Sequence, residues 1–222
     1  MWKFFARMNI FRLCGDMLHL TSIILLLVRI TRSKNTTGVS CRMQEMYLIV
    51  FITRYLDLLW SFVSVYNSVM KITYIAATAY AIYLIRFKRP LCETYDRSID
   101  NFPYEKFLLG PCAILAVLST HEYTIAEILW TFSVWLEAVA ILPQLVLLQQ
   151  SREVENLTSN FVAAMGAYRL FYILNWVYLY FGDQPVLLSA VIGGVVQVGL
   201  YVDFFYYYAR SKWYGQKLIL PE

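Results

Sequence analysis

Long apolar stretches separated by short polar connections dominate the pattern of this chain. Seven stretches are long enough to be helical: residues 9–30, 47–65, 72–85, 107–119, 125–148, 161–180 and 186–208. Most approach the roughly 20 residues that a helix needs to cross the hydrocarbon core of a bilayer. Backbone groups at that depth need internal hydrogen bonds, which a helix supplies and a lone strand does not. The pattern therefore predicts an all-α integral membrane protein with seven transmembrane helices.

The third and fourth stretches are shorter than a full membrane span, and flanking aromatic residues are expected to extend both into the interface. No linker rich in Pro, Gly or Ser divides the chain. We expect one membrane domain over residues 1–222, with residues 209–222 as a tail. The first stretch carries Arg12, Asp16 and His19, which a signal-peptide core does not tolerate, so we expect it to be retained.

Composition excludes an ordinary soluble domain, because 59% of the residues are hydrophobic, only 15% are charged and the mean hydropathy is +0.53. The four cysteines show neither CxxC spacing nor a nearby histidine. We therefore expect no metal site and no disulfide framework.

Basic residues gather in alternate connections, which sets the expected orientation. They follow the first, third and last stretches: Arg29, Arg32, Lys34, Arg42; Arg86, Lys88, Arg89, Arg97, Lys106; Arg210, Lys212, Lys217. The other connections contribute only Lys71. The positive-inside rule then predicts a cytosolic C-terminus and a lumenal or external N-terminus, although Lys3 and Arg7 count against it.

Several ionisable side chains lie inside the apolar stretches, where each costs about 2.5 to 3.5 kcal/mol. The nine are Arg12, Asp16, His19, Arg54, Asp57, Glu127, Glu137, Arg169 and Asp203. Helical spacing puts Arg12, Asp16 and His19 on one stripe, and Arg169, Tyr172 and Trp176 on another. We expect these stripes to face one cavity. The alternative is a set of structural ion pairs, such as Arg54 with Asp57 or Arg169 with Glu137.

The arginines favour an anionic ligand, because guanidinium groups bind carboxylates bidentately. Asp57 and Glu127 are expected nearer the outer face, where they would take a ligand cation. A short peptide with charges of both signs fits this mixture. His19 adds a switch, since an imidazole with an ordinary pKa of about 6.5 changes charge between compartments of different pH.

The residues of these stretches resemble the KDEL receptors, the ER lumen protein-retaining receptors, over nearly the whole chain. The resemblance is carried by Met8-Asn9-Ile10-Phe11-Arg12, Gly15-Asp16, His19, Arg54-Tyr55-Leu56-Asp57-Leu58, Glu127-Ile128-Leu129-Trp130-Thr131-Phe132-Ser133, Ala140-Ile141-Leu142-Pro143-Gln144-Leu145, Tyr168-Arg169, Asn175-Trp176 and Asp203-Phe204-Phe205-Tyr206. The Pro143-Gln144 pair also resembles the PQ-loop signature of SWEET-type transporters. That similarity implies two parallel three-helix bundles joined by a fourth helix.

The resemblance implies a receptor that binds the C-terminal tetrapeptide of escaped ER proteins in the Golgi and releases it in the ER. It implies that Arg54 and Tyr55 hold the terminal carboxylate, Arg12 an acidic side chain, and Asp57 with Glu127 the first residue of the tetrapeptide. The implied ligand-binding set is Arg12, Arg54, Tyr55, Asp57, Glu127, Trp130, Arg169, Tyr172 and Trp176, and the implied pH switch is His19 with Glu137 and Tyr168.

Three departures from the family pattern affect these expectations. Leu179 stands where the family usually has an arginine, so the preferred tetrapeptide is open. The tail has Gln216-Lys217 in place of two lysines, which leaves Lys212 and Lys217 to bind the COPI coat. An extension, Met1 to Arg7, precedes the family's usual start.

Two other functional classes compete with this interpretation. A PQ-loop transporter of small solutes, working by alternating access, is the main alternative. An enzyme is disfavoured because no nucleophile-base pair and no metal motif occur, so no catalytic residue and no cofactor are expected. Membrane lipids are expected partners, whereas nucleic acid is not, because the basic residues follow the topology.

Overall fold

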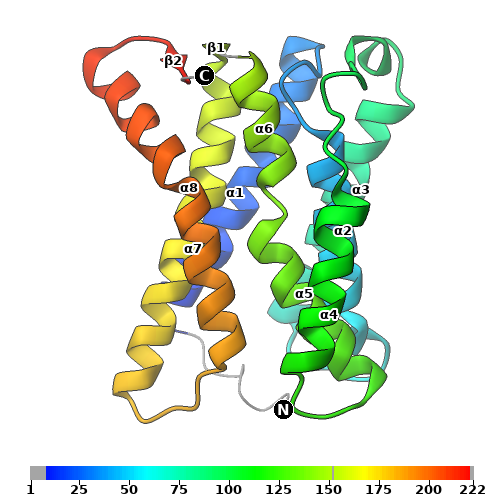
Figure 1. Cartoon of the computed structure of the whole chain (residues 1–222), viewed down its shortest axis with the longest axis vertical. Helices are drawn as coiled ribbons and strands as arrows, with labels where there is room; N and C mark the ends of the chain where they lie inside the picture. Colours follow the sequence, from blue (N-terminus) through cyan, green and yellow to red (C-terminus); the bar gives the residue numbers. More distant parts are fainter. Residues whose placement is uncertain (1–8, 152, 221–222) are drawn as a thin grey trace.

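The computed structural model describes residues 9–151 and 153–220, so the extension from Met1 to Arg7 lies outside the described residues. The α-helices are α1 (Ile10–Ser33), α2 (Cys41–Arg54), α3 (Val65–Arg86), α4 (Gly110–Ser119), α5 (Ile125–Val139), α6 (Leu142–Ser151), α7 (Asn156–Phe181) and α8 (Leu188–Tyr214) (Figure 1). Two-residue strands β1 (Glu153–Val154) and β2 (Leu218–Ile219) pair antiparallel. The prediction of an all-α chain is confirmed apart from this short ladder.

Four helical stretches of the described chain are long and apolar enough to cross a membrane. They are Ile10–Ser33, Val65–Arg86, Ile125–Ser151 and Leu188–Tyr214. The third contains both α5 and α6, which run end to end (Figure 1). Pro143, in the first turn of α6, has no backbone N–H to donate, and the helical pattern breaks between Val139 and Leu142. The predicted helix over residues 125–148 is therefore two helices in one rod.

The boundaries predicted for the second and third helices were wrong. Helix α2 begins six residues earlier than expected, where the Ser40 side chain caps it by accepting from the Met43 N–H at 3.1 Å, and it ends at Arg54. A 3-10 turn (Leu56–Leu59) follows, and residues 60–64 are not helical. Ser64 then caps α3 through the Asn67 N–H. Residues 66–71, expected to be a loop, are thus the first turns of α3, because a capping serine outweighs local hydropathy.

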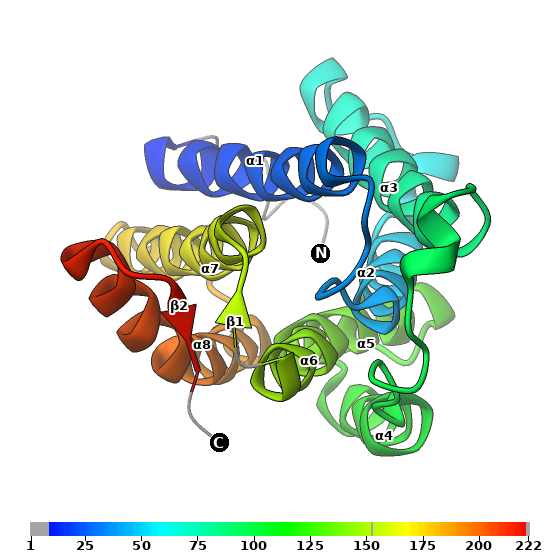
Figure 2. The same ribbon diagram turned by 90° about the horizontal axis from the view of Figure 1, so that it is seen from above.

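Helices far apart in the sequence form the walls of the bundle (Figure 2). Helix α1 packs on α7 and α3, and α2 packs on α3 and α5. Helix α8 packs on α5 and α7, whereas α4 packs on the outside of α5. A π-helical turn (Glu105–Leu109) precedes α4 and lengthens that short helix.

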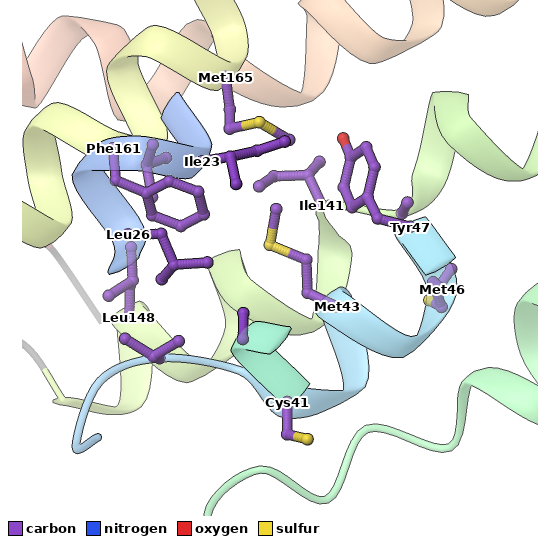
Figure 3. Close-up of a cluster of buried hydrophobic side chains, with 14 of the residues drawn as sticks. Ile23, Leu26, Cys41, Met43, Met46, Tyr47, Ile141, Leu148, Phe161 and Met165 are labelled. Atoms are coloured by element: carbon purple, nitrogen blue, oxygen red, sulfur yellow. The ribbon is translucent and has the colours of Figure 1, made fainter. Parts of the chain in front are cut away.

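A dense apolar core fills the half of the bundle that carries β1 and β2, which we call the ladder end. Figure 3 shows its side chains, among them Ile23 and Leu26 of α1, Met43 of α2, and Phe161 and Met165 of α7. Each is at most 5% exposed. Side chains packed this closely leave little room for water or solute.

Hydrogen bonds of Gln144 and Asp100 fix the connections at the ladder end. Gln144 of α6 donates through Nε2 to the Gly38 carbonyl at 2.8 Å and accepts at Oε1 from the Ser40 N–H at 2.8 Å. Asp100, in the connection after α3, accepts from Ser40 Oγ at 2.8 Å and from Tyr95 Oη at 2.6 Å. Burial, followed by the bond to Asp100, raises the pKa of Tyr95, so this phenol keeps its proton at physiological pH.

Candidate functional site

A cavity of about 570 Å³ lies between α1, α2, α3, α5, α7 and α8. Its lining extends to Gln184 and Pro185 in the α7–α8 connection, so it lies toward the end of the bundle opposite the ladder. The structure brings both predicted polar stripes to this one cavity. Its ionisable lining residues other than tyrosine are Arg12, Asp16, His19, Arg54, Asp57, Lys71, Glu137 and Arg169.

Glu137 of α5 is the electrostatic centre of the cavity. One carboxylate oxygen pairs with Arg54 Nη1 of α2, and the other pairs with Arg169 Nη2 of α7 at 2.6 Å. Tyr168 donates its hydroxyl to the second oxygen at 2.8 Å. The pair Arg169 with Glu137, considered from the sequence as structural, is therefore present. The pair Arg54 with Asp57 is not, because Arg54 turns to Glu137 instead.

Asp57 pairs with Lys71, a residue that the sequence reasoning placed in an outer loop. Both side chains are largely buried, at 1% and 12% exposure. The misplaced start of α3 hid this contact. Ser64 followed by Asn67 was the available signal, since serine is a strong N-terminal cap.

His19 of α1 lies between aromatic rings. Its imidazole stacks on the Tyr168 ring at a centroid distance of 4.2 Å and an interplanar angle of 5°, and on the Tyr74 ring at 4.8 Å. Phe51 contacts it at 5.6 Å. Tyr168 thus contacts both groups, since its ring stacks on the imidazole and its hydroxyl donates to the Glu137 carboxylate.

Asp16, one turn before His19, is held by phenols from two other helices. It accepts from Tyr66 Oη of α3 at 3.0 Å and from Tyr172 Oη of α7. Tyr74 also donates to the Asp16 backbone carbonyl at 2.9 Å. Asp16 lies in the cavity lining, as its place on the predicted stripe with Arg12 and His19 indicates, whereas the sequence analysis missed Tyr66, which falls in the region expected to be a loop.

Two glycines leave space for aromatic rings that line the cavity. A Cβ at Gly194 of α8 would lie 2.5 Å from the Trp176 ring, and a Cβ at Gly15 of α1 would lie 2.9 Å from the Tyr172 ring. Tyr172 and Trp176 are one turn apart on α7 with ring centroids 6.3 Å apart. The rings stand where they do because these positions lack a side chain.

The other predicted ligand-binding residues lie at different places around the cavity. Tyr55, Trp130 and Arg12 line it, as does Leu179. Glu127 is buried at 5% exposure but does not belong to the lining, and its Oε1 has no hydrogen-bond partner among the described residues. Its expected place beside Asp57 in one subsite is therefore not seen in this structure.

The two tail lysines lie at the ladder end. Lys212 belongs to the last turn of α8 and donates to Asn156 Oδ1 of α7 at 3.0 Å. Lys217 pairs with Glu153 beside the β1–β2 ladder. Residues 209–214, expected to start a tail, continue α8.

Buried nitrogen atoms without partners define what the cavity can bind. Within the described part of the chain, Arg54 Nη2, Arg169 Nε and His19 Nε2 have no hydrogen-bond partner, and all three residues line the cavity. Buried polar groups are nearly always satisfied in folded proteins, so unsatisfied ones indicate a missing partner. Two of them are guanidinium donors, which match carboxylate oxygens.

The fold and the site define a polytopic helical membrane protein with a cationic, aromatic-lined binding cavity. Comparisons with known proteins agree with this class. The family model described as ER lumen protein retaining receptor matches residues 35–179. The chain belongs to this family of receptors. It is 59% identical to an ER lumen protein-retaining receptor of Plasmodium falciparum over 216 residues, which cover 96% of this chain and 98% of that one. Receptors of the same name from Petunia hybrida and Drosophila melanogaster are each 47% identical, with 96% of this chain and all of theirs covered.

Proposed function

We propose that this protein is a receptor for the C-terminal tetrapeptide of soluble ER proteins, a KDEL-like signal. It would bind the signal in the Golgi and return its cargo to the ER by COPI-dependent transport. The observation that carries the proposal is the set of three unpartnered nitrogens, on Arg54, Arg169 and His19, that line one cavity. A peptide's terminal carboxylate supplies two acceptor oxygens, which match the hydrogen-bond donors of an unpartnered guanidinium group.

In this proposal Arg54 and Tyr55 hold the terminal carboxylate, and Arg12 takes an acidic side chain. Tyr172, Trp176 and Trp130 supply apolar contact to the peptide. Asp57 and Glu127 are proposed for a cationic first residue. That assignment requires the Asp57–Lys71 pair to open and Glu127 to turn toward the cavity on binding.

Protonation of His19 is the proposed pH switch. The groups that surround its ring are Tyr47, Phe51 and Arg54 from α2, Tyr74 from α3, Glu137 from α5, and Tyr168 and Arg169 from α7. An imidazolium at this place adds positive charge to a cavity that receives carboxylates. Ligand affinity is therefore expected to rise as pH falls, with Glu137 and Tyr168 rearranging around the ligand.

We propose seven transmembrane spans, formed by α1, α2, α3, α4, the α5–α6 rod, α7 and α8. The contacts of α3 with α1 and α2, and of α8 with α5 and α7, support two three-helix bundles joined by α4. The positive-inside rule places the ladder end in the cytosol and the N-terminus in the lumen. Lys212 and Lys217 would then face the COPI coat, once their contacts with Asn156 and Glu153 are released.

A receptor is favoured over a transporter by the fixed cations of the cavity, since Arg12, Arg54 and Arg169 all line it. An alternating-access transporter needs a path that opens to each side in turn. Here the half of the bundle beyond His19 is filled by buried side chains such as Leu26, Met43 and Phe161. In this conformation the packed core closes the ladder end, as expected for a receptor that binds and releases its ligand on the same side.

The test is equilibrium binding of labelled peptides to the purified full-length protein at acidic and neutral pH. Peptides ending in KDEL-like tetrapeptides should bind more tightly at acidic pH as free acids, and amidation of the C-terminus should abolish binding. Because Leu179 replaces a family arginine, peptides with a neutral residue at each acidic position belong in the set. If no acidic tetrapeptide bound, the receptor proposal would fail and solute-uptake assays would follow.

A further inference from the structure

Gln197 of α8 is a fully buried polar residue that lies behind the wall of the cavity. Its side chain is 0% exposed. It does not belong to the cavity lining, to which α8 contributes Ala190, Gly193 and Gly194, about one helical turn before it. A ligand in the cavity would therefore not touch Gln197 directly.

The side-chain amide of Gln197 donates to phenols of two other helices. Its Nε2 lies 3.3 Å from Tyr168 Oη of α7 and 3.4 Å from Tyr47 Oη of α2. Its Oε1 has no hydrogen-bond partner within the described part of the chain. Burying a carbonyl oxygen without a partner costs free energy, so an apolar side chain would suit packing alone better. The N–H groups of Gln197, and the phenols that they reach, are therefore the reason to look for a functional role.

Two N–H groups directed at the Tyr168 hydroxyl set the direction of its own proton. Tyr168 Oη accepts from Gln197 Nε2 and from Arg169 Nη2, each at 3.3 Å. The hydroxyl proton then goes to Glu137 Oε1, at an oxygen–oxygen distance of 2.8 Å. Donation to the phenol oxygen also polarises its O–H bond, which strengthens the bond to the carboxylate. Gln197 thus acts on Glu137 through Tyr168.

We propose that Gln197 is a positioning residue of the ligand site, which holds the Tyr168 hydroxyl in its bond to Glu137; this rests on the receptor function proposed above. The Glu137 carboxylate pairs with Arg54 and with Arg169. A strong bond from Tyr168 reduces the share of that carboxylate's charge that Arg54 must balance. Arg54 is then freer to bind a ligand carboxylate, so removal of the Gln197 amide lowers ligand affinity.

The pH dependence of binding responds to the same contact. The His19 ring stacks on the Tyr168 ring at a centroid distance of 4.2 Å. A Glu137 carboxylate that receives a weaker bond from Tyr168 favours the His19 imidazolium, so peptide binding should persist to higher pH without the Gln197 amide. The titratable and charged groups around His19 and Tyr168 come from all the helices packed against them: Tyr47 and Arg54 of α2, Tyr74 of α3, Glu137 of α5, Arg169 and Tyr172 of α7, and Tyr201 of α8.

The experiment measures binding of a KDEL-like free-acid peptide to the purified full-length protein from acidic to neutral pH, in the wild type and in Gln197→Met. Methionine matches glutamine in length but donates no hydrogen bond. Gln197→Met should lower the affinity at acidic pH roughly 2- to 10-fold and move the midpoint of the pH profile up by roughly 0.4 to 1 unit, the effect of one neutral hydrogen bond. Gln149→Met, which changes an exposed glutamine of α6, is the control and should keep the wild-type profile.

A double-mutant cycle separates positioning from a general packing effect. In a Tyr168→Phe background, Gln197→Met should change neither the affinity nor the midpoint further, because the hydroxyl through which Gln197 acts is gone. Gln197→Asn covers the case in which Gln197→Met fails to fold, since its amide is one carbon too short to reach Tyr168 and should shift the profile in the same direction.

The outcomes distinguish this proposal from the receptor function on which it rests. A wild type that bound no peptide at any pH would overturn both. Acid-dependent binding in the wild type, with an unchanged profile in Gln197→Met and Gln197→Asn, would overturn the role of Gln197 alone. An equal change in the wild-type and Tyr168→Phe backgrounds would also overturn that role, because it would show an effect that does not pass through Tyr168.

Discussion

Arg54 of α2 and Glu137 of α5, separated by 83 positions in the chain, form an ion pair inside the central cavity. A second arginine, Arg169, shares the same carboxylate from α7. One carboxylate held by two guanidinium groups leaves spare hydrogen-bond donors, and Arg54 Nη2 is one of them. This surplus of donors is the basis of the first prediction.

Arg54→Ala should remove the proposed peptide's carboxylate partner. A hydrogen bond between charged groups contributes roughly 1.5 to 3 kcal/mol, so binding should weaken roughly 10- to 100-fold or more. Equilibrium binding of a KDEL-like peptide checks this. Arg89→Ala, which removes an exposed arginine that pairs with Glu93, is the control and should bind as the wild type does. Equal affinity in the two variants would remove Arg54 from the binding site.

His19→Gln should flatten the pH dependence of peptide binding while leaving a binding site in place. The wild type should lose affinity as pH rises from acidic to neutral, because a bound carboxylate favours an imidazolium, whose charge is lost on deprotonation. Glutamine keeps a polar side chain but cannot gain a proton. His121→Gln replaces the only other histidine, which is exposed, and should keep the wild-type profile. A steep profile in His19→Gln would place the switch elsewhere.

Lys71→Met should destabilise the protein, since it leaves the buried Asp57 carboxylate without its cation. Breaking one side of a buried ion pair costs about 3 to 5 kcal/mol. Thermal unfolding of the purified protein should show a clear fall in Tm. The double variant Asp57→Asn with Lys71→Met should recover part of it, because no buried charge then stands alone.

Arg89→Met provides the matched comparison for that pair. It breaks an exposed ion pair with Glu93, whose partners are 86% and 62% exposed, so its effect should be under about 1 kcal/mol. A similar Tm loss in Arg89→Met and Lys71→Met would show that burial does not set the strength of the Asp57–Lys71 contact.

Gly194→Ala should weaken peptide binding by displacing the Trp176 ring, which a Cβ would approach to 2.5 Å. The neighbouring Gly193→Ala is the natural control, since its nearest atom would be 3.5 Å away, an ordinary contact. Both positions line the cavity. Peptide binding and the intrinsic tryptophan fluorescence, to which Trp176 contributes, should therefore change in the first variant and stay constant in the second.

Much of the fold was predictable because hydropathy and helix length are local properties of a membrane chain. The all-α class and the gathering of the Arg12 and Arg169 stripes around one cavity followed from periodicity alone. Helix ends did not follow, because the caps at Ser40 and Ser64 set them within an otherwise apolar background. The hydropathy pattern also could not predict which charged side chains form ion pairs. Whether Arg54 pairs with Asp57 or with Glu137 depends on the packing of α2 against α5. Lys71 could not be predicted as the partner of Asp57, because α3 was expected to begin seven residues later than it does.

The polar cavity is lined as far as His19 and Tyr168, and the buried side chains of Ile23, Leu26 and Met165 follow toward the ladder end. A polypeptide cannot pass through a cavity that is closed at one end, so it enters the cavity only with its terminus. On our proposal the receptor recognises the end of the chain as well as the sequence of its last four residues. The same four residues placed inside a loop, or followed by one more amino acid, would present no terminal carboxylate to Arg54. Cargo would then be sorted by the integrity of its last residue, and trimming or extension by a single amino acid would be enough to release a protein from retrieval.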